Sequence, residues 1–364
     1  MPEIRYETAR LKELTKPFWT GNFMLYEPIM PVARTEGERI EGRLLYKPEE
    51  IVEVRNARLD TVYEEGTDWV VEDGRLWFPP RSRVPITRIE EMFPEENREG
   101  WVQERVGGGY SLFSEGHFFH DKQVAVSYKC RKTGGYRALA GIETACPERT
   151  AAKLANAEPL NLLVFGDSIA EGANASGLTG AAPFLPTWGD QVRAILEEAC
   201  GSKIAYKNGS VGGITSEGGL QIVDRVLEDM APDLAIIAFG MNDGTGKVAP
   251  DRYAANISAI MKRMEAANGA AEFILVAPML ANPDTYFSGN QAAYAAVLRD
   301  LAGASGGRAA VADMTAVHRE LLKHKDYADL TGNNVNHPND FLIRCYAQVL
   351  IALILGEADS ETAL

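Results

Sequence analysis

The chain has 364 residues, which is long for one compact domain and predicts two. Its composition, 46% hydrophobic and 24% charged, is that of a water-soluble globular protein with material for a sizeable core. The formal net charge of −14 argues against nucleic acid or an anionic membrane as the main partner, because both attract a basic surface.

The N-terminal segment and the cysteines bear on the cellular compartment. Charged residues interrupt residues 1–19, where a secretory signal needs a continuous apolar stretch. No segment reaches the roughly 18 to 20 apolar residues that span a bilayer. The cysteines are scattered without a CxxC spacing, which favours buried thiols over disulfides or a metal site: Cys130, Cys146, Cys200 and Cys345. We expect a cytoplasmic protein, with a signal peptide already removed as the alternative.

Residues 1–150 have the composition of a β-rich domain. Two short apolar runs flank Asp73-Gly74, a pair typical of a type I′ hairpin turn. Apolar residues alternate along residues 124–128, which predicts one face of a half-buried strand. The sequence therefore predicts a β-sandwich, jelly-roll-like accessory domain over residues 1–150.

From residue 155 onwards the pattern changes to strand, loop and helix in alternation. Five apolar runs have the length and composition of buried parallel strands: Leu162–Phe165, Ile204–Tyr206, Leu234–Phe239, Phe273–Ala277 and Ala309–Ala312. One helical stripe begins near Pro250 and ends at Asn268, and a last helix follows Pro338. This alternation predicts a doubly wound, three-layer α/β domain over residues 155–364, whose ligand site lies at the carboxyl ends of the strands.

Four short polar stretches lie where this rule places a site. Each follows a predicted strand or precedes the last helix: Gly166-Asp167-Ser168-Ile169, Asn208-Gly209-Ser210-Val211-Gly212-Gly213, Gly240-Met241-Asn242-Asp243 and Asn334-Val335-Asn336-His337-Pro338. In isolation each is an ordinary turn, loop or helix entry. Together and in this order they resemble the sequence blocks of the SGNH (GDSL-type) hydrolase family, over residues 160–350.

The resemblance implies a serine esterase. In the family's pattern Ser168 is the nucleophile and His337 is the base. Gly213 and Asn242, with the backbone N–H of Ser168, match the oxyanion-hole donors. These residue types suit the chemistry, because an imidazole can take the serine proton near neutral pH and fixed N–H groups can stabilise an oxyanion.

One position departs from the family's pattern. The family has an aspartate three residues before the histidine, and this chain has Asn334 there. An asparagine oxygen can orient the imidazole but adds no negative charge, and replacing the aspartate of serine proteases costs about 10⁴ in rate. We predict a Ser–His dyad whose imidazole is held by Asn334 or by a backbone carbonyl. Another acid, Asp329 or Asp340, is the alternative.

The resemblance also indicates a substrate class. Carbohydrate esterases with a β-sandwich ahead of the catalytic domain are similar in layout, which implies hydrolysis of short acyl esters, above all acetyl esters of sugars, through an acyl-serine intermediate. A general short-chain arylesterase or thioesterase is one alternative, and a non-catalytic carbohydrate-binding protein on a hydrolase scaffold is another. We expect a small acylated substrate, no metal or organic cofactor, and neither nucleic acid nor a membrane as partner.

Other polar features are expected to play lesser roles. His117 and His120 are three residues apart in a β-rich stretch and are expected on opposite faces, which disfavours a shared metal ion. His318 is expected on a solvated helix face. The loop 279–289 follows the fourth predicted parallel strand and is a candidate rim of the substrate site.

Overall fold

A computed structural model describes residues 8–132, 136–142 and 146–356. Its strands are β1 (Phe23–Ile29), β2 (Val32–Ala33), β3 (Ile40–Gly42), β4 (Pro48–Asn56), β5 (Val62–Tyr63), β6 (Val70–Glu72), β7 (Arg75–Phe78), β8 (Thr87–Arg88), β9 (Val102–Glu104), β10 (Tyr110–Leu112), β11 (Val124–Cys130), β12 (Leu160–Gly166), β13 (Ile204–Asn208), β14 (Leu234–Ala238), β15 (Glu272–Ala277) and β16 (Ala309–Asp313).

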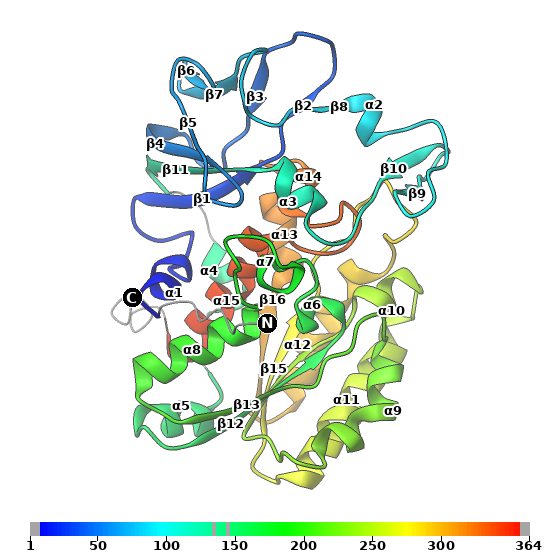
Figure 1. The fold of residues 1–364 in the computed structure, drawn as a ribbon. Coiled ribbons are helices and arrows are strands. Elements are labelled where there is room, and N and C mark those ends of the chain that lie inside the picture. Colours follow the sequence, from blue (N-terminus) through cyan, green and yellow to red (C-terminus); the bar gives the residue numbers. More distant parts are fainter. Residues whose placement is uncertain (1–7, 133–135, 143–145, 357–364) are drawn as a thin grey trace.

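Helices are concentrated in the second half of the chain (Figure 1). They are α1 (Thr8–Leu14), α2 (Ile89–Met92), α3 (Phe118–Lys122), α4 (Tyr136–Leu139), α5 (Glu148–Ala155), α6 (Ser168–Glu171), α7 (Ser176–Thr179), α8 (Trp188–Cys200), α9 (Ser216–Leu227), α10 (Met241–Thr245), α11 (Pro250–Ala267), the 3₁₀ helix η1 (Gln291–Ala293), α12 (Tyr294–Ala304), α13 (Met314–Leu321), α14 (Tyr327–Leu330) and α15 (Asp340–Leu355).

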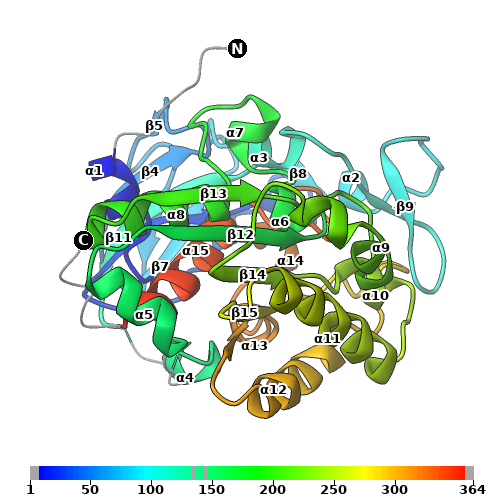
Figure 2. The ribbon, with the colours of Figure 1, turned by 90° about the horizontal axis from the view of Figure 1, so that it is seen from below.

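The second half of the chain folds into three layers. Five parallel strands form a sheet in the order β13-β12-β14-β15-β16. Helices α9, α11 and α12 cover one face, and α8, α13 and α15 cover the other (Figures 1 and 2). The strand order reverses direction between β12 and β14, and such a switch point opens a crevice at the carboxyl ends of the strands. The predicted doubly wound sheet and all five of its strands are confirmed.

The first part of the chain is rich in strands, as predicted. Sheets with the orders β1-β11-β4-β5 and β3-β7-β6 lie there, together with the pairs β9–β10 and β2–β8. The hairpin between β6 and β7 turns at Asp73 and Gly74, whose φ angles of 53° and 71° are those of a type I′ turn. Strand β11 is more buried than its half-buried prediction, because it is a central strand with β1 and β4 on its two sides.

The two parts of the chain share one hydrophobic core. A single cluster of buried residues includes Leu76 and Val126 from the strand-rich part and Leu162 and Tyr346 from the α/β part. The limits predicted for the two domains, 1–150 and 155–364, remain predictions.

Helix α15 is largely apolar and buried on all sides, and this follows from its position. It packs against α8, β16 and β1, so that the sheet and the strand-rich part both cover it. Across the described residues no helix combines the length and the apolarity that a membrane crossing requires.

A buried ion pair joins the strand-rich part to the α/β part. The side chains of Glu27 on β1 and Lys325, which follows α13, are 0% and 1% exposed, and Lys325 Nζ lies 2.9 Å from Glu27 Oε1. The Leu45 N–H and the Tyr128 hydroxyl also donate to the Glu27 carboxylate. The buried carboxylate therefore has protein partners in place of water.

We expect Lys325→Met to destabilise the protein by about 3 to 5 kcal/mol, because it leaves the Glu27 carboxylate buried without its cation. Chemical denaturation of the full chain measures the change. The control is Lys323→Met, which removes an exposed lysine paired with Glu320 and should cost less than about 1 kcal/mol. Equal losses of unfolding free energy in the two variants would show that the buried pair stabilises the protein no more than the exposed pair does.

Candidate active site

Ser168 lies at the first turn after the strand β12, near the switch point of the sheet. The residue before it, Asp167, caps the short helix α6: its Oδ1 accepts from the Ile169 N–H at 3.1 Å, and its Oδ2 accepts from the Met241 N–H at 3.1 Å. Burial raises the pKa of Asp167 to about 7, although these two N–H groups favour the carboxylate. Gly166 is required by space, since a Cβ there would lie 2.2 Å from the Ala238 carbonyl oxygen.

His337 reaches Ser168 from the loop that precedes α15. Its Nε2 lies 2.9 Å from Ser168 Oγ, which is hydrogen-bonding distance. The loop is held by Asn333, whose Oδ1 accepts from the backbone N–H groups of Val335, Asn336 and His337, each at 3.0 Å. Ser168 is 8% exposed and the His337 side chain is 12% exposed, so the pair is shielded but has an open side.

The second ring nitrogen of His337 faces two side-chain oxygens. Its Nδ1 lies 2.8 Å from Asn174 Oδ1 and 3.2 Å from Glu115 Oε2. The Asn174 amide cannot be turned round, because its Nδ2 donates to the carbonyls of Gly116 and Gly332. Two acceptors at Nδ1 place the ring proton there. Nε2 is then left as the acceptor for the Ser168 hydroxyl.

Asn334 does not occupy the position that we predicted for it. Its Nδ2 donates to the Leu112 carbonyl at 2.9 Å and to Ser111 Oγ at 3.2 Å, while its own backbone carbonyl accepts from Asn282 Nδ2 at 2.7 Å. The prediction that Asn334 orients His337 is therefore wrong in this geometry. Asn334 has a left-handed backbone, with a φ of 64°. Its side chain therefore points away from the imidazole and contacts the strand-rich part.

The other predicted candidates for the third position also bond elsewhere. Asp329 accepts from the N–H groups of Met30 and Asp326, and burial raises its pKa to about 6. Asp340 Oδ1 accepts from the Ser176 N–H at 2.9 Å. The acceptors at the imidazole are side-chain oxygens of residues outside the four sequence blocks, and not a backbone carbonyl.

Sequence reasoning missed Asn174 and Glu115. Asn174 lies six residues after the serine and has a φ of 63°. Glu115 lies in the strand-rich part, 222 positions before the histidine. A weak signal existed for Asn174, since asparagine is among the non-glycine residues that best tolerate a left-handed backbone; Glu115 carries no local signal.

The two predicted oxyanion donors lie in one linked unit. Gly213 has a φ of 78° and open space where a Cβ would stand. The adjoining Gly212 passes close to the serine, because a Cβ on it would lie 3.8 Å from Ser168 Cβ. Asn242 Nδ2 donates to the Ile214 carbonyl at 3.0 Å, which ties α10 to this loop. The oxyanion role of Gly213 and Asn242 remains a prediction.

The remaining histidines have partners of their own. The His117–His120 stretch adjoins the helix α3, contrary to the expected strand; His117 Nδ1 lies 2.7 Å from Asp121, and His120 Nε2 lies 2.8 Å from the Ala182 carbonyl oxygen. Within the described ranges, no three His, Cys, Asp or Glu residues are grouped to hold a metal ion.

His318 is fully buried, so its predicted solvated position is wrong. Its Nδ1 accepts from the Leu280 N–H at 3.1 Å, and burial lowers its pKa to about 3. The loop 279–289 covers this face of α13, which the helical pattern alone could not reveal.

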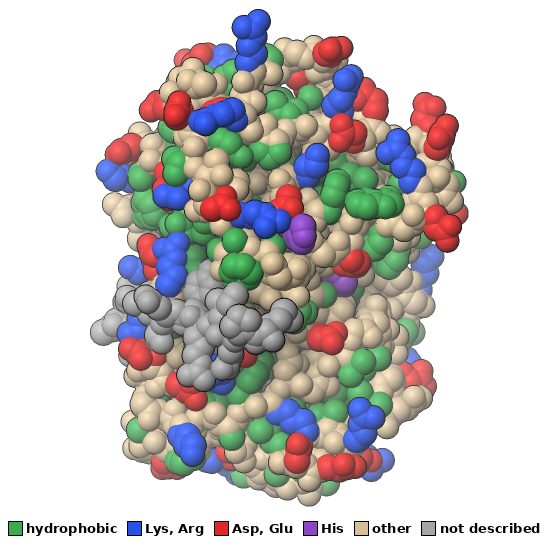
Figure 3. Space-filling view, viewed as in Figure 1, with side chains coloured by type: hydrophobic (Ala, Val, Ile, Leu, Met, Phe, Trp, Pro, Cys, Tyr) green, Lys and Arg blue, Asp and Glu red, His purple; other side chains and the backbone are tan. Residues whose placement is uncertain are grey.

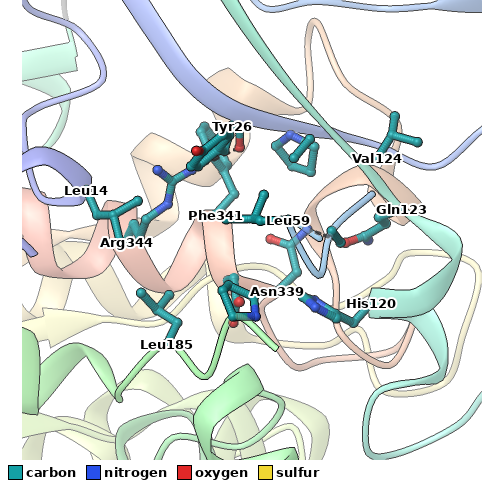
Figure 4. Close-up of a pocket in the computed structure, with 15 residues that line it drawn as sticks. Leu14, Tyr26, Leu59, His120, Gln123, Val124, Leu185, Asn339, Phe341 and Arg344 are labelled. Carbon is teal, nitrogen blue, oxygen red and sulfur yellow. Dashed lines mark hydrogen bonds between the residues drawn. The ribbon is translucent and has the colours of Figure 1, made fainter. Parts of the chain in front are cut away.

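A separate cavity of about 50 Å³ lies between β11, the 183–185 segment and the start of α15 (Figure 4). Its walls are mainly apolar and include Leu59, Val124 and Phe341, but neither Ser168 nor His337. The volume is enough for one or two water-sized groups. Because the catalytic pair does not line it, this cavity is separate from the serine site.

Residues 164–341 match the model of the GDSL-like Lipase/Acylhydrolase family, and the four sequence blocks all fall inside this range. This stretch of the chain is therefore similar to that family. It is 33% identical over 98 residues to an arylesterase of Vibrio mimicus, a match that covers 27% of this chain and 44% of that relative. The chain therefore spans less than half the length of the curated relative it matches.

Two solved structures are similar at low sequence identity. One is a two-domain esterase active on acetylated mannans, with 18% identity, a TM-score of 0.46, and coverage of 57% of this chain and 51% of that chain. The other is a catalytic mutant of an acetylxylan esterase from Geobacillus stearothermophilus, with 20% identity, a TM-score of 0.43, and coverage of 54% and 94%.

We expect Asn174→Asp to lower the free energy of unfolding by about 2 to 4 kcal/mol. The new carboxylate would face the carbonyls of Gly116 and Gly332, which lose their donor; the Gly332 carbonyl is buried and the Gly116 carbonyl partly so. Urea denaturation measures the loss. Asn156→Asp, an exposed position at the end of α5, is the control and should change little. An unchanged stability for Asn174→Asp would contradict the assigned orientation of the amide.

Proposed function

We propose that this protein is a serine esterase that hydrolyses short acyl esters, with Ser168 as nucleophile and His337 as base. The observation that carries the proposal is the 2.9 Å contact between Ser168 Oγ and His337 Nε2, with the Nδ1 proton of the same ring anchored on Asn174. The match of residues 164–341 to the model of an acylhydrolase family supports it.

The proposed reaction has two halves. His337 takes the hydroxyl proton as Ser168 Oγ bonds to the ester carbonyl carbon, and the Ser168, Gly213 and Asn242 N–H groups stabilise the oxyanion. The intermediate collapses, and the imidazolium gives its proton to the departing alcohol. Water, deprotonated by the same imidazole, then attacks the acyl-serine and releases the carboxylic acid. No step requires a cofactor.

We extend the proposal to acetyl esters of carbohydrates. The loop 279–289 packs on the histidine-bearing block, where the Asn282 N–H donates to the Val335 carbonyl. Tyr286 extends from this loop with 58% of its surface exposed, and such a ring with a polar tip suits a sugar, which has one apolar face and several hydroxyls. On the face in Figure 3 acidic and basic side chains are interspersed, which suits an uncharged substrate.

Two alternatives differ in what they require. A general arylesterase or thioesterase would use the same Ser168–His337 pair without a sugar subsite, and the arylesterase relative favours it. A non-catalytic carbohydrate-binding protein has no need of a histidine whose tautomer is fixed toward a serine hydroxyl, so the site geometry disfavours it.

The first test is hydrolysis of 4-nitrophenyl acetate. We expect Ser168→Ala and His337→Ala each to lower kcat by about 10⁴-fold or more, because either change removes the activated nucleophile. Ser305→Ala, at the residue that follows the outer helix α12, and His324→Ala, at an exposed position, serve as controls and should keep the wild-type rate. Activity that survives both site substitutions would disprove the assignment of the pair.

The second test concerns the substrate. We expect kcat/KM for acetylated xylo- or manno-oligosaccharides to exceed that for 4-nitrophenyl acetate and for an acetyl thioester. Tyr286→Ala should lower kcat/KM for the sugar esters by about tenfold and leave the nitrophenyl ester unaffected, since one ring contact contributes on the order of 1 kcal/mol. Val62→Ala, an exposed residue of β5, is the control. Equal loss on all substrates would favour the general esterase.

A further inference from the structure

The strand-rich part of the chain contributes a carboxylate to the serine site. Glu115 lies just after β10, on the segment 111–116 that contacts the histidine-bearing loop at several points. Ser111 and Leu112 accept from Asn334, and Gly116 accepts from Asn174. The position of this segment is therefore fixed by the α/β part itself.

The Glu115 carboxylate is held at both oxygens. Its Oε2 lies 3.2 Å from His337 Nδ1, and its Oε1 accepts from Asn333 Nδ2 at 3.0 Å. Asn333 is the residue whose side chain holds the backbone of His337. The carboxylate thus contacts the imidazole and also the side chain that sets the imidazole's place.

Glu115 is charged when His337 acts. Partial burial raises its pKa, but the hydrogen bonds and charge interaction with His337 and the Asn333 hydrogen bond lower it further, so the net change is downward from its ordinary value. The side chain is 51% exposed, so solvent weakens its field compared with a buried aspartate.

We propose that Glu115 is a positioning residue for His337: the strand-rich part supplies the negative charge that the histidine block of this chain lacks, and Asn174 supplies the hydrogen bond that fixes the tautomer. The catalytic consequence rests on the proposed function. The imidazole–carboxylate pair itself can be tested without any substrate.

Other groups around His337 must be kept constant in such a test. Ser168 and Asn174 contact the ring, and the buried carboxylate of Asp167 also interacts with its charge. Glu171 lies beside the oxyanion loop, where a Cβ on Gly212 would meet its Oε2 at 2.9 Å. All remain in place when only Glu115 is changed.

The substrate-free experiment is a nitrogen-15 NMR titration of the imidazoles in the full chain. With five histidines in the sequence, His337 can be assigned from the signal that disappears in His337→Gln. We expect the Nδ1-protonated tautomer in the wild type. In Glu115→Gln the titration midpoint of His337 should fall by about half a pH unit, because the imidazolium loses its anionic neighbour.

Two variants keep this test falsifiable. Glu104→Gln removes an exposed carboxylate from β9, the partner strand of β10, and should leave the midpoint in place. Glu115→Asp keeps the charge and should keep most of the wild-type midpoint, which decides the question should Glu115→Gln unfold. A midpoint unmoved in Glu115→Gln, or moved equally by Glu104→Gln, would overturn the proposal.

Kinetics supply the second measurement. Only the neutral imidazole can act as the base, and the Glu115 carboxylate favours the protonated form. Removing this charge in Glu115→Gln should therefore move the acid limb of the kcat/KM profile to lower pH. The plateau should fall by about 10- to 100-fold, less than the loss from a buried aspartate. A lower plateau with an unmoved limb indicates a structural role only and would contradict the proposal. If the wild type hydrolyses no ester, the proposed function fails while the titration still decides the role of Glu115.

Discussion

The site depends on the buried side chain of Asn333, which holds the loop that carries the histidine. One amide oxygen accepts from three successive backbone N–H groups at 3.0 Å, so the loop before α15 has one shape. Thr331 Oγ1 accepts from the N–H of Asn334 at 2.8 Å and extends the same arrangement. Held in this way, the loop places His337 Nε2 within hydrogen-bonding distance of Ser168 Oγ. The position of the imidazole is therefore set by the backbone of the loop as well as by the His337 side chain.

The strand-rich part acts on this loop through packing and polar contacts together. Its residues share a core with α8 and α15, and the pair Glu27–Lys325 anchors its first strand beside α14. Such an interface fixes the segment 111–116 to within hydrogen-bonding distance of the loop. Precision at a site of this kind requires rigid neighbours, because a displacement of about 1 Å can cost 10²-fold in rate.

The sequence was sufficient for the scaffold and for the residues that follow its strands. Buried parallel strands are continuous apolar runs, and the sheet rule places the residues that follow them, Ser168 among them, at one edge. The family resemblance paired Ser168 with His337, which precedes α15. Local pattern could not provide Glu115, since its contact with His337 depends on how the two parts of the chain pack. The interpretation of Asn334 failed for a related reason: spacing from the histidine says nothing about the left-handed backbone that turns the side chain away.

Amide side chains, together with the hydroxyls of Thr331 and Tyr327, hold the loop that carries His337. Asn174, Asn282, Asn333 and Asn334 make these bonds with groups that neither gain nor lose a proton in water. Acidification therefore changes the charges of His337 and Glu115 but does not change the protonation of the amides that hold the loop. A loop fixed by ionised aspartates would lose charged acceptors as they became neutral, whereas the amides and hydroxyls that hold this loop keep their donors and acceptors.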